Sequence, residues 1–196
     1  MEQFIFITLI IASILSLTFI IERGLALRWT HVIPPAVEQA QESCKTLGQI
    51  DNLRAVCQSH PSPLSNLLLT AANHLDRPRE ETIDALQTRA RKEVVRLERG
   101  LVLLEIVTGI APLLGLVGTV MGLIKLFGAM SSATGDQGKF AEGISVALNA
   151  TLMGLIIAIP SLVAWSYYNK KVETLTVEME THCDEFIRRQ YRQMEH

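Results

Sequence analysis

Two threonines, Thr119 and Thr151, are the side chains best placed to do chemistry, because each lies in the middle of a long apolar segment. A hydroxyl both donates and accepts a hydrogen bond, so it can hold water or relay a proton without a buried charge. The ordinary alternative is that each hydroxyl only bonds back to the carbonyl four residues earlier in its own helix. Thr108 lies on the same helical face as Thr119, nearer the start of that segment.

Three further polar residues lie near the ends of the same two segments. Glu105 lies about one turn inside its segment, where it either reaches the membrane surface or marks the cytoplasmic exit of a proton path. Glu142 and Asn149 share one helical face, and Asn149 lies about two turns inside its segment, so it should face protein or water. Asn149 and Thr151 point in directions about 200° apart. If Thr151 faces a central axis, Asn149 is therefore expected to face a neighbouring subunit.

Small residues form a stripe along each of these segments. Their spacings are three or four residues, which places every member of a set on one face of a helix. Such stripes let helices approach closely in lipid, and they favour a packed ring with a narrow polar path over a soluble enzyme. Pro112 and Pro160 lie inside the same segments, and a kink is expected at Pro160. The stripes comprise Thr108, Ala111, Gly115, Gly118 and Gly122 in one segment, and Gly143, Ala147, Ala150, Gly154, Ala158 and Ser161 in the other.

Three apolar runs are long enough to cross a bilayer, which needs about 20 residues. Residues 4–21 and 143–168 contain no charge, and residues 101–127 contain only Glu105 and Lys125. The first run has no basic region before it and no cleavage signal after it, so it is interpreted as an uncleaved anchor rather than a signal peptide. We therefore predict an all-α membrane protein with three transmembrane helices, at residues 1–21, 101–127 and 143–168.

The distribution of Lys and Arg predicts the orientation of these spans, because such residues gather on the cytoplasmic side. Basic residues follow the first run, precede the second and follow the third, whereas the segment between the second and third holds only Lys139. The N-terminus and a loop over 128–142 are therefore expected in the periplasm. Residues 22–100 are expected to form a cytoplasmic helical region, and residues 169–196 a cytoplasmic helical tail.

Helical patterns continue from the last two spans into the cytoplasmic regions. A helix is expected over 36–58, between proline-containing breaks, and a short one over 64–74. From Pro78 no proline intervenes before Pro112, so one long helix is expected to rise into the second span. An apolar stripe from Val172 to Phe186 predicts that the third span continues as an amphipathic helix ending near Tyr191. These extensions could pack within one subunit or form a cage around a central axis.

The sequence shows no pattern that is typical of an enzyme, a metal centre or a nucleic-acid-binding surface. It has no phosphate-binding loop, no HExxH and no GxSxG motif. Cys44, Cys57 and Cys183 have no metal-ligand spacing and are expected to be reduced structural thiols. The net charge is −2, with no basic stripe that carries interleaved aromatic residues. We therefore expect no enzyme activity, no metal, no cofactor and no nucleic-acid partner.

Two motifs resemble the signatures of the MotA/TolQ/ExbB proton-channel family. One is residues 111–122, which read APLLGLVGTVMG, and the other is residues 143–151, which read GISVALNAT and are followed by Gly154, Ala158 and Pro160. Three spans with a cytoplasmic region between the first two are most similar to the ExbB and TolQ members, since MotA itself has four. From Ala111 to Pro160 the two motifs span 50 residues, and the shared topology covers the whole chain.

This resemblance implies a pentameric ring in the bacterial inner membrane, in contact with lipids, around two copies of a single-span partner similar to ExbD or TolR. The partner's membrane aspartate would carry the proton, while Thr119 and Thr151 would face the pore. Proton flow would then move the partner against the ring. The resemblance favours energising of TonB-dependent outer-membrane import, with a TonB-like protein as a further partner. A TolQ-like role in envelope integrity, another motor role, and a non-conducting membrane scaffold are the alternatives.

One position departs from the ExbB and TolQ pattern. Val146 stands where these members usually carry Glu, which puts in question any mechanism that needs a ring carboxylate at that level. Glu142 and Asn149 lie about one turn to either side of Val146, and either could supply polarity instead. MotA-like members also have an apolar residue there, so the partner's aspartate would be the only essential carboxylate.

Overall fold

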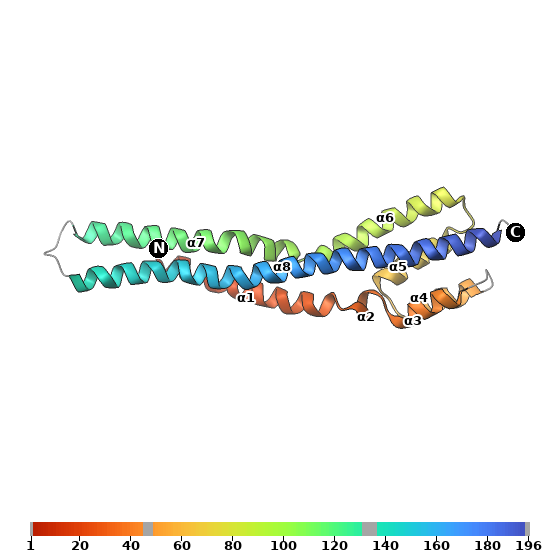
Figure 1. Cartoon of the computed structure of the whole chain (residues 1–196), viewed down its shortest axis with the longest axis horizontal. Helices are drawn as coiled ribbons and strands as arrows, with labels where there is room; N and C mark the ends of the chain where they lie inside the picture. Colours follow the sequence, from red (N-terminus) through yellow and green to blue (C-terminus); the bar gives the residue numbers. More distant parts are fainter. Residues whose placement is uncertain (1, 45–48, 131–136, 195–196) are drawn as a thin grey trace. The chain divides into compact units, whose positions relative to one another are not determined.

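The computed structural model describes residues 2–44, 49–130 and 137–194, and every regular element within them is a helix (Figure 1). At residues 2, 129–130, 137–142 and 146 only the helical backbone is described. The helices, in chain order, are α1 (Glu2–Ala26), α2 (Trp29–Val32), α3 (Pro35–Ser43), α4 (Ile50–Ser59), α5 (Pro63–Asn73), α6 (Arg79–Glu98), α7 (Leu101–Met130) and α8 (Gln137–Met194). They form two compact units, and α8 contributes to both. The first unit is Met1–Arg23 with Gly100–Tyr167, and the second is Gly24–Arg99 with Tyr168–His196.

Three helices are long and apolar enough to cross a membrane: Gln3–Ala26 in α1, Leu101–Gly128 in α7, and the described part of α8 from Gly143. Large apolar side chains are exposed along all three, as expected of surfaces that face lipid or neighbouring subunits. The prediction of an all-α chain with three candidate spans is therefore confirmed. Helical backbone reaches Met130 and resumes at Gln137, so both helices extend into the segment expected as a loop over 128–142.

The first unit packs α1 against α7 and α8. Ile5 and Leu9 of α1 form a buried cluster with Ala111 of α7 and with Ile157 and Ala158 of α8. The packing is almost entirely apolar, because side chains in a membrane have few polar partners apart from one another.

One buried polar contact also joins α1 to α8. The hydroxyls of Ser16 and Ser161 lie 2.5 Å apart, and the Ser161 hydroxyl also reaches the carbonyl of Ile157 at 2.7 Å. A buried hydroxyl pair in an apolar interface favours one register of the two helices, since a slip would separate the two hydroxyls and leave Ser16 without this partner. Spacing alone does not indicate this contact. Thr8 and Thr18 lie in the same apolar run, yet their hydroxyls bond to carbonyls of their own helix.

The predicted continuous helix from residue 79 into the second span is wrong, because α6 and α7 are separate helices. α6 ends at Glu98, α7 begins at Leu101, and Gly100 between them has a φ of 92°. Glycine adopts this left-handed conformation without the steric cost that a Cβ brings, and it commonly ends helices in this way. A single glycine within a helical pattern is a weak signal in a sequence, whereas the backbone angle is decisive.

Replacing Gly100 with Ala is therefore expected to destabilise the protein by about 1–2 kcal/mol. The new Cβ would also lie 3.1 Å from Nε of Arg23 and 3.2 Å from Cδ1 of Phe19. Gly109→Ala is the matched control, because a Cβ there meets nothing within 4 Å and alanine favours a helix by roughly 1 kcal/mol over glycine. Denaturant unfolding of the purified protein in detergent checks both variants. Equal changes in the free energy of unfolding would show that the left-handed backbone at Gly100 is not required.

The second unit is a small bundle in which the end of α8 completes the core. Prolines stand at the starts of α3, α5 and α6, where their missing N–H costs nothing. The hydroxyl of Ser62 caps α5 by accepting a hydrogen bond from the backbone N–H of Ser65 at 3.1 Å. The predicted apolar stripe of α8 is confirmed as part of this core. Its buried members are Val172, Leu175, Met179, Cys183 and Phe186.

The single helix predicted over 36–58 is wrong, since this segment forms two helices, α3 and α4. Val37 and Gln41 of α3 are buried, as are Ile50, Leu53 and Cys57 of α4. Two shorter helices can each turn a buried face towards the core of this unit, which one straight helix of that length could not do. Residues 45–48 between them lie outside the described residues.

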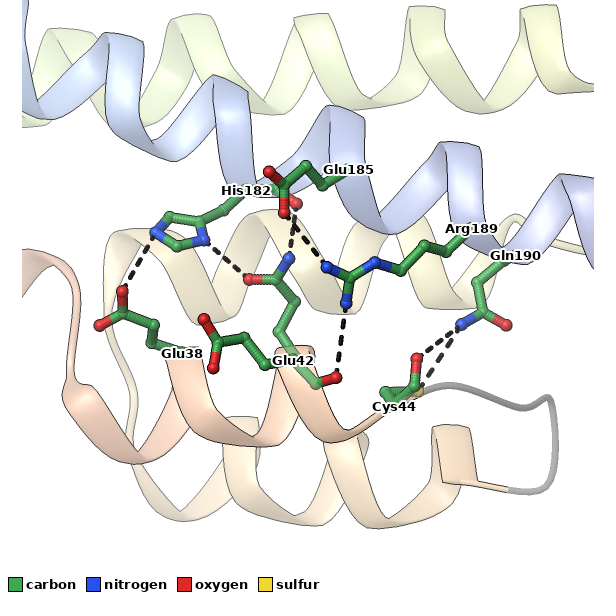
Figure 2. Close-up of polar contacts among 8 residues, drawn as sticks. Glu38, Glu42, Cys44, His182, Glu185, Arg189 and Gln190 are labelled. Carbon is green, nitrogen blue, oxygen red and sulfur yellow. Dashed lines mark hydrogen bonds and ion pairs between the residues drawn. The ribbon is translucent and has the colours of Figure 1, made fainter.

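Polar side chains clamp α3 onto α8 within the second unit (Figure 2). The amide of Gln41 donates to the carbonyl of His182 at 3.0 Å, and its oxygen lies 2.8 Å from Nδ1 of the same histidine. Gln190 donates to the carbonyl of Cys44 at 3.2 Å, and Arg189 donates to that of Glu42 at 3.4 Å. Gln41 and Gln190 are buried, so these bonds satisfy amide N–H groups that would otherwise be costly to bury. The tail helix is thus an integral part of the bundle formed by residues 24–99.

The three cysteines are buried thiols in the second unit, and none forms a disulfide. Burial raises the pKa of Cys57 to about 11, and that of Cys183 to about 12 with a smaller contribution from Glu180. Because the thiolate is the reactive form, we expect Cys183 to react with a maleimide at pH 8 only when the bundle opens. Unfolded thiols ionise near their ordinary pKa of 9.0 while the folded ones stay protonated, so stability should fall as pH rises from about 9 to 11. Mass spectrometry after timed maleimide labelling checks the expected protection of Cys183. Rapid modification of Cys183 in the folded protein would contradict it.

Candidate functional site

α7 and the first part of α8 run side by side in opposite directions, and glycines let their backbones touch (Figure 1). A Cβ added to Gly115 would lie 2.8 Å from the carbonyl oxygen of Ala150 and 2.9 Å from Cα of Thr151. A Cβ added to Gly154 would lie 2.5 Å from the carbonyl oxygen of Ala111. Real Cβ atoms do not approach other atoms this closely, so this part of the contact requires glycine.

The remaining small residues continue the same contact along both helices. A Cβ on Gly118 would lie 2.7 Å from Cβ of Ala150, and one on Gly122 would lie 2.9 Å from Cβ of Ala147. Ala158 is buried in the cluster with α1. Pro112 is half-buried inside α7, and Pro160 is exposed inside α8. Within one chain, the structure therefore brings the two small-residue stripes together.

Thr119 and Thr151 meet at the place where Gly115 brings the helices together, and their hydroxyl oxygens are in hydrogen-bond contact. The Thr119 hydroxyl lies 3.2 Å from the carbonyl oxygen of Gly115 and 3.1 Å from that of Ala147. The Thr151 hydroxyl lies 3.1 Å from the same Gly115 oxygen. Gly115 is four residues before Thr119, and Ala147 is four residues before Thr151. Each hydroxyl therefore contacts, on the opposite helix, the carbonyl that the other threonine would ordinarily bond to, four residues before it.

This crossed arrangement holds two hydroxyl protons among four oxygen atoms. Each hydroxyl donates one hydrogen bond and can accept two. Thr151 can donate to Thr119 while Thr119 donates to Ala147, or Thr119 can donate to Thr151 while Thr151 donates to Gly115. The direction of the hydrogen-bond chain can therefore reverse without movement of any heavy atom. Neutral groups that relay a proton must be able to reverse their hydrogen bonds in this way.

The other predicted polar residues are not part of this pair. The Thr108 hydroxyl donates to the carbonyl of Glu105 at 2.7 Å, which is the ordinary local role of a helical threonine. It lies eleven residues before Thr119, or about 16 Å along the helix. The side chains of Glu105 and Asn149 are exposed in the single chain. The side chains of Glu142 and Val146 lie outside the described residues.

Residues 59–181 match the profile of the MotA/TolQ/ExbB proton channel family, and this range holds both threonines and both stripes. The chain belongs to the MotA/TolQ/ExbB proton channel family. The resemblance expected from the two motifs is therefore confirmed. MotA/TolQ/ExbB proteins are channels rather than enzymes, which agrees with the expectation that the chain has no enzyme activity.

Individual relatives carry both ExbB and TolQ names. The chain is 33% identical over 140 residues to a biopolymer transport protein ExbB homolog of Methanothermobacter thermautotrophicus, covering 71% of this chain and 50% of the relative. It is 34% identical over 169 residues to an ExbB-like protein of Synechocystis, covering 80% and 63%. It is 28% identical over 199 residues to the Tol-Pal system protein TolQ of Pseudomonas aeruginosa, covering 94% and 85%. The chain thus spans less than two thirds of the length of each of the first two relatives, and most of this TolQ.

Proposed function

We propose that this chain is the ring subunit of a proton-driven motor in the cytoplasmic membrane, with the hydroxyls of Thr119 and Thr151 in its proton path. The observation that carries this proposal is the crossed hydrogen bonding of the two threonines between α7 and α8. Hydroxyls that only stabilise their own helix would bond to their own carbonyls, as Thr18 does on α1. Thr151 instead reaches the carbonyl of Gly115 on the other helix.

The ring itself is part of the proposal. Large apolar side chains are exposed along α1, α7 and α8, and such surfaces can face neighbouring copies and a partner as well as lipid. Family membership supports a pentamer around two copies of a single-span partner that carries a membrane aspartate. The distribution of Lys and Arg supports cytoplasmic positions for residues 22–100 and 169–196, with the segment between α7 and α8 on the opposite side.

The threonine pair suits a partner whose carboxylate carries the proton. An ionised carboxylate only accepts hydrogen bonds, whereas the protonated acid also donates one. Each hydroxyl can accept a hydrogen bond from the acid, and either can donate to the ionised form by giving up its bond to the carbonyl of Ala147 or Gly115. This lowers the cost of either state inside an apolar ring. One proton crossing a potential of 100 mV releases about 2.3 kcal/mol. That free energy is available to move the partner against the ring.

The process that receives the force is proposed from the names of the relatives. Two relatives are named as biopolymer transport proteins of the ExbB type. Together with the family resemblance, these names favour energising of import across the outer membrane through a TonB-like protein. The match to TolQ covers 94% of this chain, and it supports a role in envelope integrity as the second candidate. Deletion of the gene separates the two: loss of uptake with an intact envelope supports the first, and detergent sensitivity supports the second.

Reconstitution tests the motor proposal directly. The chain and its native single-span partner are purified together, placed in liposomes with a pH-sensitive dye, and exposed to an imposed potential. Proton uptake above that of protein-free liposomes, lost when the partner's aspartate is changed to Asn, is the expected result. An intact complex without any proton uptake would favour a non-conducting membrane scaffold.

A further inference from the structure

The second unit carries two exposed charged stripes, one on α6 and one on α8. On α6 and at its end, Lys92, Val95 and Arg99 are exposed and follow spacings of three and four residues. Val95 is 66% exposed, although its neighbours on the other side of α6, such as Leu97, are buried. The three residues therefore form a basic stripe with an apolar centre on the solvent side of α6.

α8 carries a stripe of opposite sign with the reverse spacing. Glu173, Val177 and Glu180 are exposed, and they are separated by four and then three residues. Val177 is 57% exposed, whereas Leu175 and Met179 face the core. This acidic stripe also has an apolar residue at its centre. Lys170 pairs with Glu173 at 2.8 Å, but both of these side chains are largely exposed, so the pair contributes little.

The two stripes lie at matching heights within the unit, where height means position along the helix axes. α6 and the end of α8 run in opposite directions (Figure 1), and the hydroxyls of Thr82 and Tyr191 meet at 2.7 Å. Counted from that contact, Lys92 lies ten residues along α6 and Glu180 eleven residues back along α8. Val95 lies thirteen residues after Thr82 along α6, and Val177 lies fourteen residues before Tyr191 along α8. The counts in each pair differ by one residue, so the two side chains of a pair differ in height by only about 1.5 Å.

The third pair follows the same register. Arg99 lies seventeen residues from Thr82, and Glu173 lies eighteen residues from Tyr191. A rotation about an axis parallel to these helices preserves height, so equal heights on two different faces are what a cyclic ring requires. The order along the stripes is cation, valine, cation on α6 and anion, valine, anion on α8. A neighbouring copy related by such a rotation would therefore meet opposite charges at both ends and valine at the centre.

We propose that the α6 stripe of one copy docks on the α8 stripe of the next, and that this contact joins the cytoplasmic bundles of neighbouring subunits. The inference rests on the proposed ring, and it names the surface by which the ring closes below the membrane. The valine pair excludes water at the centre of the contact, and the charges fix its register. Because the charges are exposed, salt weakens the contact.

Disulfide cross-linking in the intact membrane complex tests the docking surface. Val95→Cys combined with Val177→Cys is expected to give a ladder of covalent oligomers under mild oxidation, since the two side chains would lie in contact across the interface. Gln87→Cys combined with Val177→Cys is the control, because Gln87 is exposed on another side of α6 and at another height. The natural cysteines are buried and do not compete. An equal yield from both pairs would overturn the proposed docking.

Charge reversal provides an independent test. Lys92→Glu alone is expected to weaken each interface by roughly two- to five-fold at low salt, and Glu180→Lys added to it should restore association. Native mass spectrometry of the detergent-solubilised complex measures the fraction of intact rings. Rings that form normally but give neither the specific ladder nor the rescue would overturn this interface and leave the motor proposal standing. A complex that shows a single copy of this chain would overturn both.

Discussion

Replacing Gly154 with Ala is expected to disrupt the contact between α7 and α8 and to abolish proton flux. The added Cβ would lie 2.5 Å from the carbonyl oxygen of Ala111 and 3.3 Å from Cα of Gly115. Both neighbours are backbone atoms, so no side-chain rotation can relieve the overlap. Overpacking of this kind costs about 1–3 kcal/mol. The helices must therefore separate, and the two threonines then lose their crossed hydrogen bonds.

Gly109→Ala is the matched control for this prediction. It makes the same chemical change in an apolar helix of the same unit, but a Cβ there meets nothing within 4 Å. Both substitutions raise helix propensity by about 1 kcal/mol, so helix propensity alone predicts that both variants are stabilised. We expect Gly154→Ala to be destabilised in denaturant and inactive in liposomes, and Gly109→Ala to be stable and active. A stable, fully conducting Gly154→Ala protein would show that close backbone contact is not needed.

Thr151→Val is expected to reduce proton flux by roughly ten-fold or more, because the proton path loses a hydroxyl, and a hydrogen bond to a charged group is worth about 1.5–3 kcal/mol. Valine has nearly the same shape as threonine, so the packing against Gly115 should survive. What disappears is the second hydroxyl, without which the hydrogen-bond chain through Thr119 cannot reverse. Flux into liposomes under an imposed potential, with the partner present, measures the effect.

Two variants make the Thr151 result specific. Thr151→Ser keeps the hydroxyl and should retain most of the flux. Thr18→Val removes a hydroxyl that bonds only to the carbonyl of Ile14 in its own helix, at 2.8 Å, and should leave the flux unchanged. Equal losses in Thr151→Val and Thr18→Val would point to a general effect on helix stability rather than to a relay.

The spacing of small residues was sufficient to predict which faces of α7 and α8 lack bulky side chains and can approach another helix closely. Side chains three or four residues apart share a helical face whatever the rest of the fold does, so the stripes through Gly115 and Gly154 can be read directly from the sequence. The same holds for the buried stripe of the tail helix, from Val172 to Phe186.

The crossed hydrogen bonds could not be predicted in this way. They depend on the register between two helices, and that register is set by backbone contacts such as that of Gly154 with Ala111. Each threonine, taken alone, fits the ordinary bond to its own helix equally well. The break at Gly100 was missed for a related reason, because a helical pattern continues on both sides of it and only its φ of 92° marks the end of α6.

The central claim is that Thr119 and Thr151 act as one relay, and a double-mutant cycle on proton flux tests it most directly. Flux is measured in liposomes for Thr119→Val, Thr151→Val and the double variant, each with the native partner and with the complex shown to be intact. If the two hydroxyls work as a unit, either single change removes the relay and the double variant conducts no less than the single ones. Losses that multiply in the double variant, or flux that survives all three changes, would contradict a shared relay.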